Sequence, residues 1–294
     1  MLEGTTGSTV PRRQLGRYLR DLRNRARLTL KVAAVELEWS EAKMWRIETG
    51  QTSLRSLDVE AMCRLYDAPV DQTEMLKALA KETKAKGWWM ADNDVLPEEF
   101  SIYLGLEEAT SRIRSYESDL VPGLLQTERY ARAIMESDSG GAQRSEFERR
   151  IQVRMARKAL YTRTTRPVEL QIVLSETILK RPVGGSEIMV EQLRALITEG
   201  RRGNVTIRVL PFRAGLHLGV QSGSFVLLEF PKTSKGEPSE PTTVYVDGYT
   251  GALFLDKPRE VERHELALDD MWERCLSQTD SLTYIEAAAR EMER

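Results

Sequence analysis

Residues 28–50 constrain this chain more than any other segment, because their pattern predicts two short helices joined by a tight turn. The side chains that would face one another across the two helices are small or apolar and recur at helical spacing: Ala33, Ala34, Leu37, Met44 and Ile47. Ser40 precedes the second helix, and its hydroxyl can accept a hydrogen bond from a free N–H group of the first turn. The segment therefore predicts a compact helical pair.

The second helix of this pair would turn a mixed set of side chains away from the first. These are Glu41, Ala42, Lys43, Trp45 and Arg46. A single helix carrying exposed polar side chains fits the major groove of double-stranded DNA. The alternative is an ordinary helical hairpin with no role in nucleic-acid binding.

The segment resembles the phage-repressor-like (XRE-type) helix-turn-helix family of bacterial regulators. The matching residues are Leu28-Thr29, Ala34, Leu37, Trp39-Ser40, Lys43 and Arg46-Ile47-Glu48-Thr49-Gly50. The resemblance implies an all-α DNA-binding domain. Three positions depart from the family pattern: Leu30 replaces a frequent Gln, Glu38 replaces the usual Gly of the turn, and Glu41 is the first outward residue. A carboxylate at Glu41 repels phosphates but can accept a hydrogen bond from cytosine N4.

The charge of the chain is nearly balanced, with 43 Lys and Arg against 45 Asp and Glu, yet its distribution is uneven. Eight basic residues and only Asp21 on the acidic side lie between Arg12 and Lys31, which suits phosphate neutralisation; a solvated helix face is the alternative. We expect base contacts from Lys43 and Arg46. The full set of candidate DNA contacts is Arg12, Arg13, Lys31, Ser40, Glu41, Lys43, Arg46 and Arg55, of which Arg12, Arg13, Lys31 and Arg55 are expected to bind phosphates.

The expected fold is multidomain, with an all-α helix-turn-helix N-terminal domain followed by a mixed α/β (α+β) C-terminal domain. The expected parts are a disordered tail at 1–10, a DNA-binding domain at 11–85, a junction at 86–97 and a C-terminal domain at 98–294, helical over 98–165 and mixed over 166–294. In the first domain we expect helices at 12–26, 56–66 and 71–84 besides the central pair. The side chains expected to face inward are Leu15, Leu19 and Leu22 on the first helix, and Leu57, Ala61, Met62 and Leu65 on the helix at 56–66.

The last third of the chain changes character, since alternating β-branched residues predict strands there. Helices are expected at 98–114, from 126 or 127 to 135, at 145–161, 186–200, 258–276 and 280–292, with a Ser/Gly loop at 138–142; strands are expected at 168–174, 205–210, 223–230 and 243–247. The strand-helix-strand run from 168 to 210 predicts a right-handed parallel crossover.

A second resemblance covers nearly the whole chain. It rests on Glu117-Ser118, Val121 to Thr127, Tyr130-Ala131, Leu174 to Glu176, Arg181 to Gly185, Asn204 to Thr206, Leu210 to Phe212, Gly223 to Phe225 and Leu253 to Leu255. These residues look like actinobacterial regulators that join a helix-turn-helix to a C-terminal DUF5753 domain, the Scr1-type antitoxin-like transcriptional regulators. The resemblance implies regulation and a possible small cognate protein encoded nearby. It supplies no defined ligand and no catalytic residues.

Residues that could bind a small ligand follow several strand ends, where pockets form in such sheets. They are Glu117, Gln126, Glu176, Arg181, His217 and Asp247, each of which could equally stabilise a loop. Two histidines and two distant cysteines show no metal-ligand spacing, and no nucleophile elbow, phosphate loop or dinucleotide motif is present. We therefore expect no metal, no cofactor and no catalytic residue.

These observations favour a cytoplasmic, homodimeric transcriptional regulator that binds double-stranded DNA. Its C-terminal domain would sense a partner protein or a small molecule, or mediate dimerisation. Two alternatives remain: an enzyme of natural-product biosynthesis that retains the regulator architecture and uses a C-terminal pocket, and a protein-interaction module whose DNA binding is vestigial. No apolar run reaches membrane-spanning length, and the first ten residues do not resemble a signal peptide.

Overall fold

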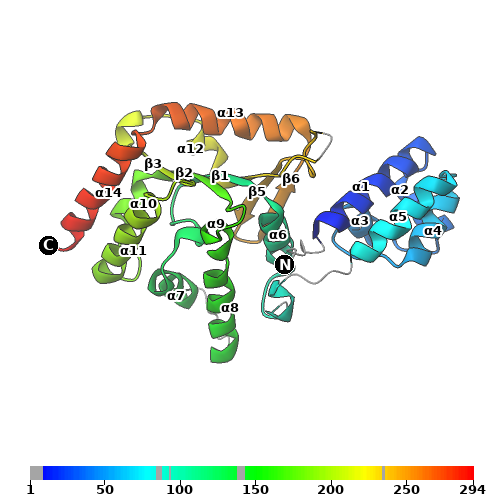
Figure 1. Ribbon diagram of the computed structural model, residues 1–294, viewed down its shortest axis with the longest axis horizontal. Helices are drawn as coiled ribbons and strands as arrows, with labels where there is room; N and C mark the ends of the chain where they lie inside the picture. Colours follow the sequence, from blue (N-terminus) through cyan, green and yellow to red (C-terminus); the bar gives the residue numbers. More distant parts are fainter. Residues whose placement is uncertain (1–8, 84–87, 93, 138–142, 234–235) are drawn as a thin grey trace. The chain divides into compact units, whose positions relative to one another are not determined.

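The computed structural model describes residues 9–83, 88–92, 94–137, 143–233 and 236–294 (Figure 1). One compact unit takes in the described residues up to Ala91 together with Phe100–Ala109, and a second takes in those of 92–99 and 110–294. Most of the expected tail (1–8), the Ser/Gly loop at 138–142, Lys84 at the end of an expected helix and part of the expected junction lie outside the described residues. Thr9 and Val10, expected in the tail, belong instead to the first helix.

The first unit begins with five α-helices, as the periodicity of the sequence predicts. They are α1 (Thr9–Arg25), α2 (Leu30–Glu36), α3 (Glu41–Glu48), α4 (Ser56–Leu65) and α5 (Val70–Glu82). A 3-10 helix, η1 (Trp88–Asp92), and α6 (Glu98–Ala109) follow. The buried side of α1 carries Leu15, Leu19 and Leu22, which confirms the predicted apolar face of that helix.

The inward face predicted for α4 is partly wrong. Leu57 is 72% exposed and Ala61 is also exposed, whereas Val59, Met62 and Cys63 are buried. Both sets satisfy helical spacing, so the sequence periodicity did not distinguish them. The buried set is the one that joins the core formed by the other helices.

A buried ion pair joins α1 to the end of α3. Arg23 donates from Nε to one carboxylate oxygen of Glu48 at 2.6 Å and from Nη2 to the other at 2.8 Å. The remaining Nη1 of Arg23 donates to the Leu28 carbonyl at 2.8 Å and to Asn24 Oδ1 at 3.1 Å. This bidentate geometry satisfies both buried charges and fixes where α3 ends relative to α1.

The second unit is built on a six-stranded mixed sheet with the strand order β3-β2-β1-β4-β5-β6. Its strands are β1 (Arg112–Glu117), β2 (Glu169–Ser175), β3 (Val205–Leu210), β4 (Phe225–Glu229), β5 (Thr243–Gly248) and β6 (Gly251–Leu255). Its helices are η2 (Gly123–Leu125), α7 (Glu128–Ser137), α8 (Arg144–Ala156), α9 (Ala159–Thr162), α10 (Glu176–Lys180), α11 (Ser186–Glu199), η3 (Phe212–Ala214), α12 (Gly219–Ser222), α13 (Pro258–Arg274) and α14 (Gln278–Met292).

The sheet divides into a parallel half and an antiparallel half. β1, β2 and β3 run parallel, so the connection predicted between β2 and β3 is confirmed as a parallel crossover through α11. β4, β5 and β6 continue the sheet as antiparallel neighbours. The register places Tyr116 opposite Phe225, and Val226 opposite Tyr245.

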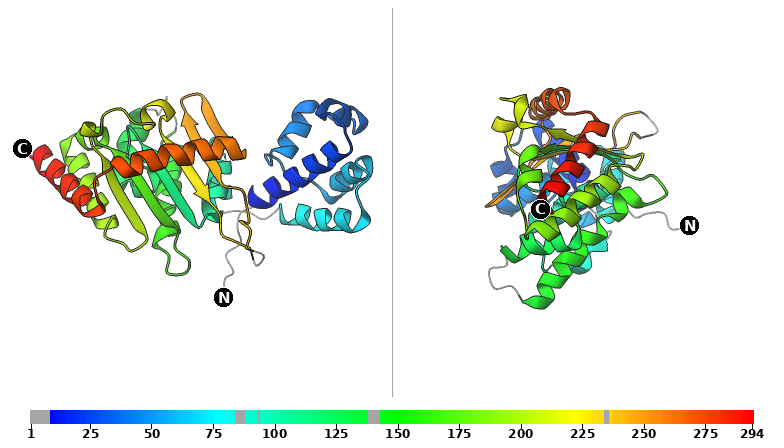
Figure 2. Two further views of the ribbon diagram at one scale, coloured as in Figure 1. Left: turned by 90° about the horizontal axis from the view of Figure 1, so that it is seen from above. Right: turned by 90° about the vertical axis from the view of Figure 1, so that its left-hand side faces the viewer.

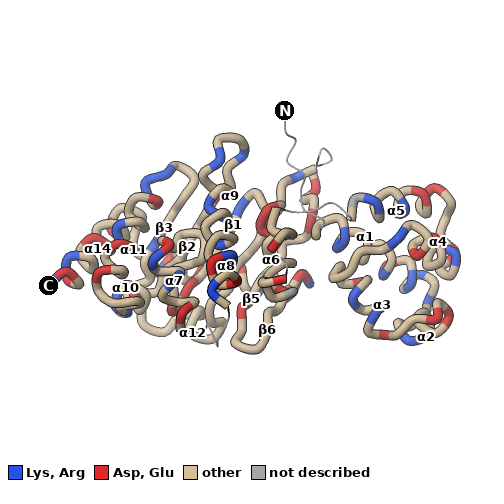
Figure 3. The backbone as a smooth tube through the Cα atoms, turned by 90° about the horizontal axis from the view of Figure 1, so that it is seen from below, with Lys and Arg blue, Asp and Glu red and all other residues tan. Residues whose placement is uncertain are grey.

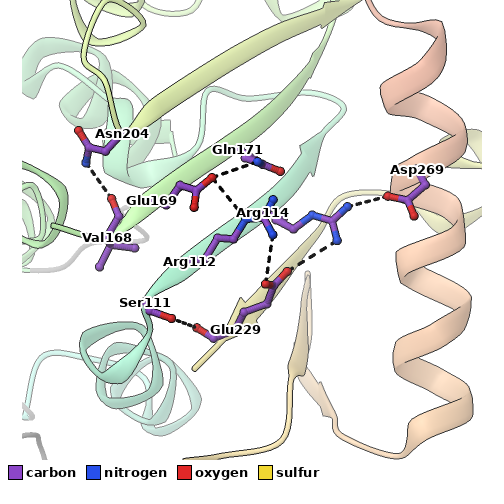
Figure 4. A network of polar contacts seen from close by, with 9 residues as sticks. All are labelled: Ser111, Arg112, Arg114, Val168, Glu169, Gln171, Asn204, Glu229 and Asp269. Atoms are coloured by element: carbon purple, nitrogen blue, oxygen red, sulfur yellow. Dashed lines mark hydrogen bonds and ion pairs between the residues drawn. The ribbon is translucent and has the colours of Figure 1, made fainter. Parts of the chain in front are cut away.

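Helices cover both faces of this sheet. α13 lies across one face, and α7, α8 and α11 lie on the other (Figures 1 and 2). Under α13, Tyr116, Phe225 and Met271 belong to one apolar cluster. The same face ends in a polar network: Glu229 bridges Arg112 and Arg114, and Arg114 donates to Asp269 of α13 at 2.7 Å (Figure 4).

The outer edge of β3 is closed by polar groups from the start of α14. The N–H groups of Ile207 and Val209 donate to Gln278 Oε1 and to Ser281 Oγ, each at 2.9 Å. The N–H of Leu276 donates to the Val209 carbonyl, also at 2.9 Å. These bonds satisfy backbone groups that an exposed edge strand would offer to another chain.

Two expected helices require correction, and one strand was missed. The helix predicted over 98–114 ends at Ala109, and residues 112–117 form β1, a central strand. The single helix predicted at 145–161 is divided into α8 and α9. The strand β6 was not predicted. In the described parts of the chain, no helix is long and apolar enough to cross a membrane.

We expect Glu48→Gln to destabilise the first unit by about 3–5 kcal/mol, because it leaves the buried Arg23 charge without its counter-charge. Urea unfolding of the full chain, followed by circular dichroism, measures this loss. Glu60→Gln is the matched control: its partly exposed carboxylate lies 3.6 Å from both Arg64 and Lys77, so less than about 1 kcal/mol should be lost. Equal, small losses in both variants would contradict a structural role of the buried pair.

Candidate functional site

The helix-turn-helix is formed by α2, a short turn and α3. Thr29 and Ser40 cap the two helices, accepting hydrogen bonds from Val32 N at 3.2 Å and Lys43 N at 3.1 Å. The turn places Glu38 at φ +56°, the left-handed conformation that glycine adopts at least cost. The cap predicted at Ser40 is therefore confirmed, and the Glu38 departure is a local strain that the surrounding packing holds in place.

The inner face of α3 is buried against α2 and α1. Met44 and Ile47 are buried, as are Ala33 and Ala34 of α2, which confirms the predicted contact face. Gly16 of α1 lies so close to the end of α3 that a Cβ atom there would stand 2.5 Å from the Ile47 carbonyl oxygen. α3 is thus fixed by close packing on one side and by the Glu48 ion pair at its end.

The outer face of α3 carries the side chains expected to meet DNA. At 100° per residue, Ala42 and Arg46 lie opposite the buried side, with Trp45 on one flank and Lys43 on the other. The Lys43 ammonium lies 3.5 Å from the centre of the Trp39 ring, a cation–π contact that restrains it. Arg46 is exposed and makes no side-chain hydrogen bond or ion pair with any residue that the structure describes.

Arg46 could instead form an ion pair within its own helix, with Glu41 or Glu48. Glu48 is instead bound by Arg23, and Glu41 is exposed at the start of α3. The Arg46 guanidinium therefore remains available to an external partner.

The basic residues expected to bind phosphates differ in accessibility. Lys31 is exposed, and Arg55 is exposed while paired with Asp58 at 3.0 Å. Arg12 is half-buried, and burial lowers the pKa of its guanidinium, whereas Arg13 is only 6% exposed. Both basic and acidic residues lie on the helices of this unit (Figure 3). Because Arg13 and Arg23 are buried, fewer of the basic residues between Arg12 and Lys31 reach solvent than the sequence predicts.

Three of the six ligand candidates lie in one polar cluster on the α8 side of the sheet. Glu117 ends β1, Asp247 lies near the end of β5, and Gln126 follows η2. Arg154 of α8 donates to Gln126 Oε1 at 2.8 Å, and Gln126 donates to the Val121 carbonyl at 2.7 Å. These bonds connect α8 to the segment that follows β1, and the charge of Asp247 acts on both Glu117 and Arg154.

The electrostatics of this cluster are unusual. Desolvation by the surrounding protein raises the pKa of Glu117 to about 8; the charge of Asp247 raises it further, while the charge of Arg157 opposes the shift. Burial, helped by the charge of Arg157, lowers the pKa of Arg154 to about 10. At neutral pH Glu117 is mostly protonated and can donate a hydrogen bond, while Arg154 stays cationic.

The other three ligand candidates serve separate contacts. Glu176 accepts hydrogen bonds from the Phe212 N–H at 2.8 Å and from the Tyr284 hydroxyl at 2.6 Å. Arg181 pairs with Asp119 at 2.9 Å. His217 meets the Tyr116 ring edge to face, and burial lowers its pKa. The six residues expected together are therefore not one site.

Arg154 and Arg157 were not included among the candidate ligand-binding residues, although a sequence pattern points to them. Arg150, Arg154 and Arg157 follow one another at helical spacing, so one side of α8 is lined with guanidinium groups. Arg150 donates to the Val95 carbonyl at 2.7 Å. Among the described residues, no three His, Cys, Asp or Glu side chains group in a way that could hold a metal ion.

The geometry of α2 and α3 and the exposed face of α3 define a protein with a helix-turn-helix DNA-binding domain. Residues 14–76 match the family model of a helix-turn-helix domain, and residues 100–287 match that of a domain of unknown function, DUF5753. Because the second match spans more than half of the chain, the protein belongs to the DUF5753 family. The comparisons with curated proteins and with solved structures found no match.

We expect Glu117→Gln to change how stability depends on pH. The raised pKa means that the folded protein holds a proton which the unfolded chain, with a pKa near 4.5, has released. Wild-type stability should therefore fall as pH rises from about 5 to 8 and level off above that. Relative to wild type, the variant should gain about 3 kcal/mol between pH 5.5 and 8.5, measured as the free energy of unfolding. Glu187→Gln, which removes an exposed carboxylate, is the control and should show no such gain.

Proposed function

We propose that this protein is a sequence-specific transcriptional regulator that binds double-stranded DNA through α3. The observation that carries the proposal is the state of Arg46, which is exposed on a helix whose inner face and end are fixed, and which has no partner among the described residues. An exposed and unpaired guanidinium on the outer face of such a helix suits bidentate recognition of guanine O6 and N7. The helix-turn-helix match supports the same function.

The remaining residues of α3 and its flanks take supporting roles in this proposal. Lys43, held over Trp39, reaches a base edge or a neighbouring phosphate. Glu41 accepts from cytosine N4, and Ser40 positions the first turn through its cap. Lys31 and Arg55 bind phosphates, while Arg12 and Arg13 contribute less because they are more buried.

We propose further that the protein acts in the cytoplasm as a homodimer, with a DNA-binding domain at 11–85, a junction at 86–97 and a C-terminal domain at 98–294. An eight-residue helix reaches only a few base pairs, so two copies on a paired site would supply the length of sequence that specific control needs. The resemblance to antitoxin-like actinobacterial regulators favours a small cognate protein as the signal read by the C-terminal domain. The Glu117–Arg154 cluster supports the other route, a small ligand bound by that domain.

Selection from a random double-stranded oligonucleotide library tests the main proposal. The full-length protein should enrich one motif, arranged as two half-sites about one helical turn apart if the dimer is correct. Recovery of unrelated sequences would contradict the proposal that the protein binds DNA sequence-specifically.

Arg46→Ala should weaken binding to the selected operator by about 1–3 kcal/mol, which is about five-fold to 150-fold in Kd. It should also relax the base preference at one position. A fluorescence-anisotropy titration against the operator and its single-base variants measures both effects. Lys81→Ala, which removes an exposed cation from α5, is the control. Unchanged affinity in Arg46→Ala would exclude the contact.

Lys31→Gln should weaken binding to all sequences about equally, because a phosphate contact carries no base information. The slope of log Kd against log salt concentration should fall by about 1. Lys81→Gln provides the comparison at constant net charge. A slope that does not differ between the two variants would show that Lys31 is only solvated surface.

A further inference from the structure

The indole of Trp45 is the largest apolar side chain on the outer side of α3. It is 51% exposed. Within the part of the chain that the structure describes, it makes no side-chain hydrogen bond and no ring contact. Trp39, in the preceding turn, differs because the Lys43 ammonium covers it.

A single exposed apolar side chain is common on protein surfaces, so exposure alone carries no function. The place of Trp45 on α3 is what matters. It lies one turn after Glu41 and three residues after Ala42, on one flank of the outer face of α3. Because Ala42 is small, no side chain at that position covers the indole, and the helix can approach a surface closely there.

The chemistry of the indole limits what it can contact in a DNA groove. Its N–H group only donates hydrogen bonds, and its rings are apolar. The major groove presents hydrogen-bonding groups and one apolar group, the C5-methyl of thymine. The Glu41 carboxylate, one turn away on the same side, disfavours close approach of phosphates, which directs the indole toward base edges.

We propose that Trp45 is a specificity-determining residue that packs against the C5-methyl group of a thymine in the major groove. This inference rests on the DNA-binding function proposed above. It divides the recognition of bases between neighbouring side chains: Arg46 reads a guanine, and Trp45 reads a thymine within about two base pairs of it, since the two residues follow one another along α3.

Deoxyuridine substitution tests this contact directly, because deoxyuridine pairs as thymidine does and lacks only the C5-methyl group. Each thymine of the selected operator is replaced in turn, and the Kd of the full-length protein is measured. Removing one buried methyl should weaken wild-type binding about four-fold at the contacted position and leave the other positions unchanged.

The same scan with Trp45 variants assigns the effect to the indole. Trp45→Ala should bind the thymine operator at least as weakly as wild type binds the deoxyuridine operator, with no further loss on substitution. Trp45→Phe keeps an apolar ring without the N–H group and should retain the methyl effect. Leu57→Ala, which removes an apolar side chain 72% exposed on α4, should behave as wild type. Because Trp45 is exposed, the melting temperature serves as the folding check and should not change.

The outcomes separate this inference from the function on which it rests. If wild type selects no operator, the proposed function fails at the first step, and the inference fails with it. If wild type selects an operator but no thymine methyl affects its Kd, only the role of Trp45 is overturned. If the methyl effect persists in Trp45→Ala, another residue makes the contact, and the proposal is overturned. It is also overturned if Trp45→Phe binds as weakly as Trp45→Ala and shows no methyl effect, because the indole N–H group then makes the contact. If Trp45→Ala binds DNA as wild type does, the indole does not contact DNA, and the proposal is overturned.

Discussion

Arg23 and Glu48 stand far apart in the sequence, yet their two buried hydrogen bonds determine where α3 ends. Two charges removed from water are stable only when each satisfies the other in good geometry. The bidentate pair meets that condition, and the bond from Arg23 to the Leu28 carbonyl extends it to the segment before α2. Together with the close approach at Gly16, it orients the outer face of α3, so the positions of Trp45 and Arg46 depend on it.

The use of arginine inside the fold changes how the charge of this chain should be interpreted. Many guanidinium groups serve internal contacts: Arg23 with Glu48, Arg114 with Glu229 and Asp269, and Arg154 with Gln126. Fewer cations are then available to phosphates than the composition suggests. In the proposed DNA complex, counterion release would therefore contribute less to the free energy of binding, and base contacts from α3 would contribute more of it.

The helix-turn-helix could be predicted from the sequence because the interactions that form it are local. The caps at Thr29 and Ser40 and the apolar spacing from Ala33 to Ile47 act within one or two turns, and the structure keeps them. β2 and β3 were also predicted from local patterns, the alternation of side chains in β2 and the β-branched residues of β3. β1 was mistaken for helix because its alternation, in which Arg112 and Arg114 share a face with Tyr116, is stabilised by Glu229 and Asp269 from distant segments.

The sequence by itself determined the helix-turn-helix, its inward residues and the side chains that α3 presents, because caps and periodicity act over a few residues. Only the tertiary structure decided which face of α4 is buried, that Arg23 is withdrawn from solvent, and that Glu117, Gln126 and Asp247 join one cluster while Glu176, Arg181 and His217 do not. Those outcomes follow from strand order and helix placement. The pKa of Glu117 is near 8 because the surrounding protein desolvates its carboxyl group and because Asp247, more than 100 residues away in the sequence, lies close to it. No local sequence pattern encodes that proximity.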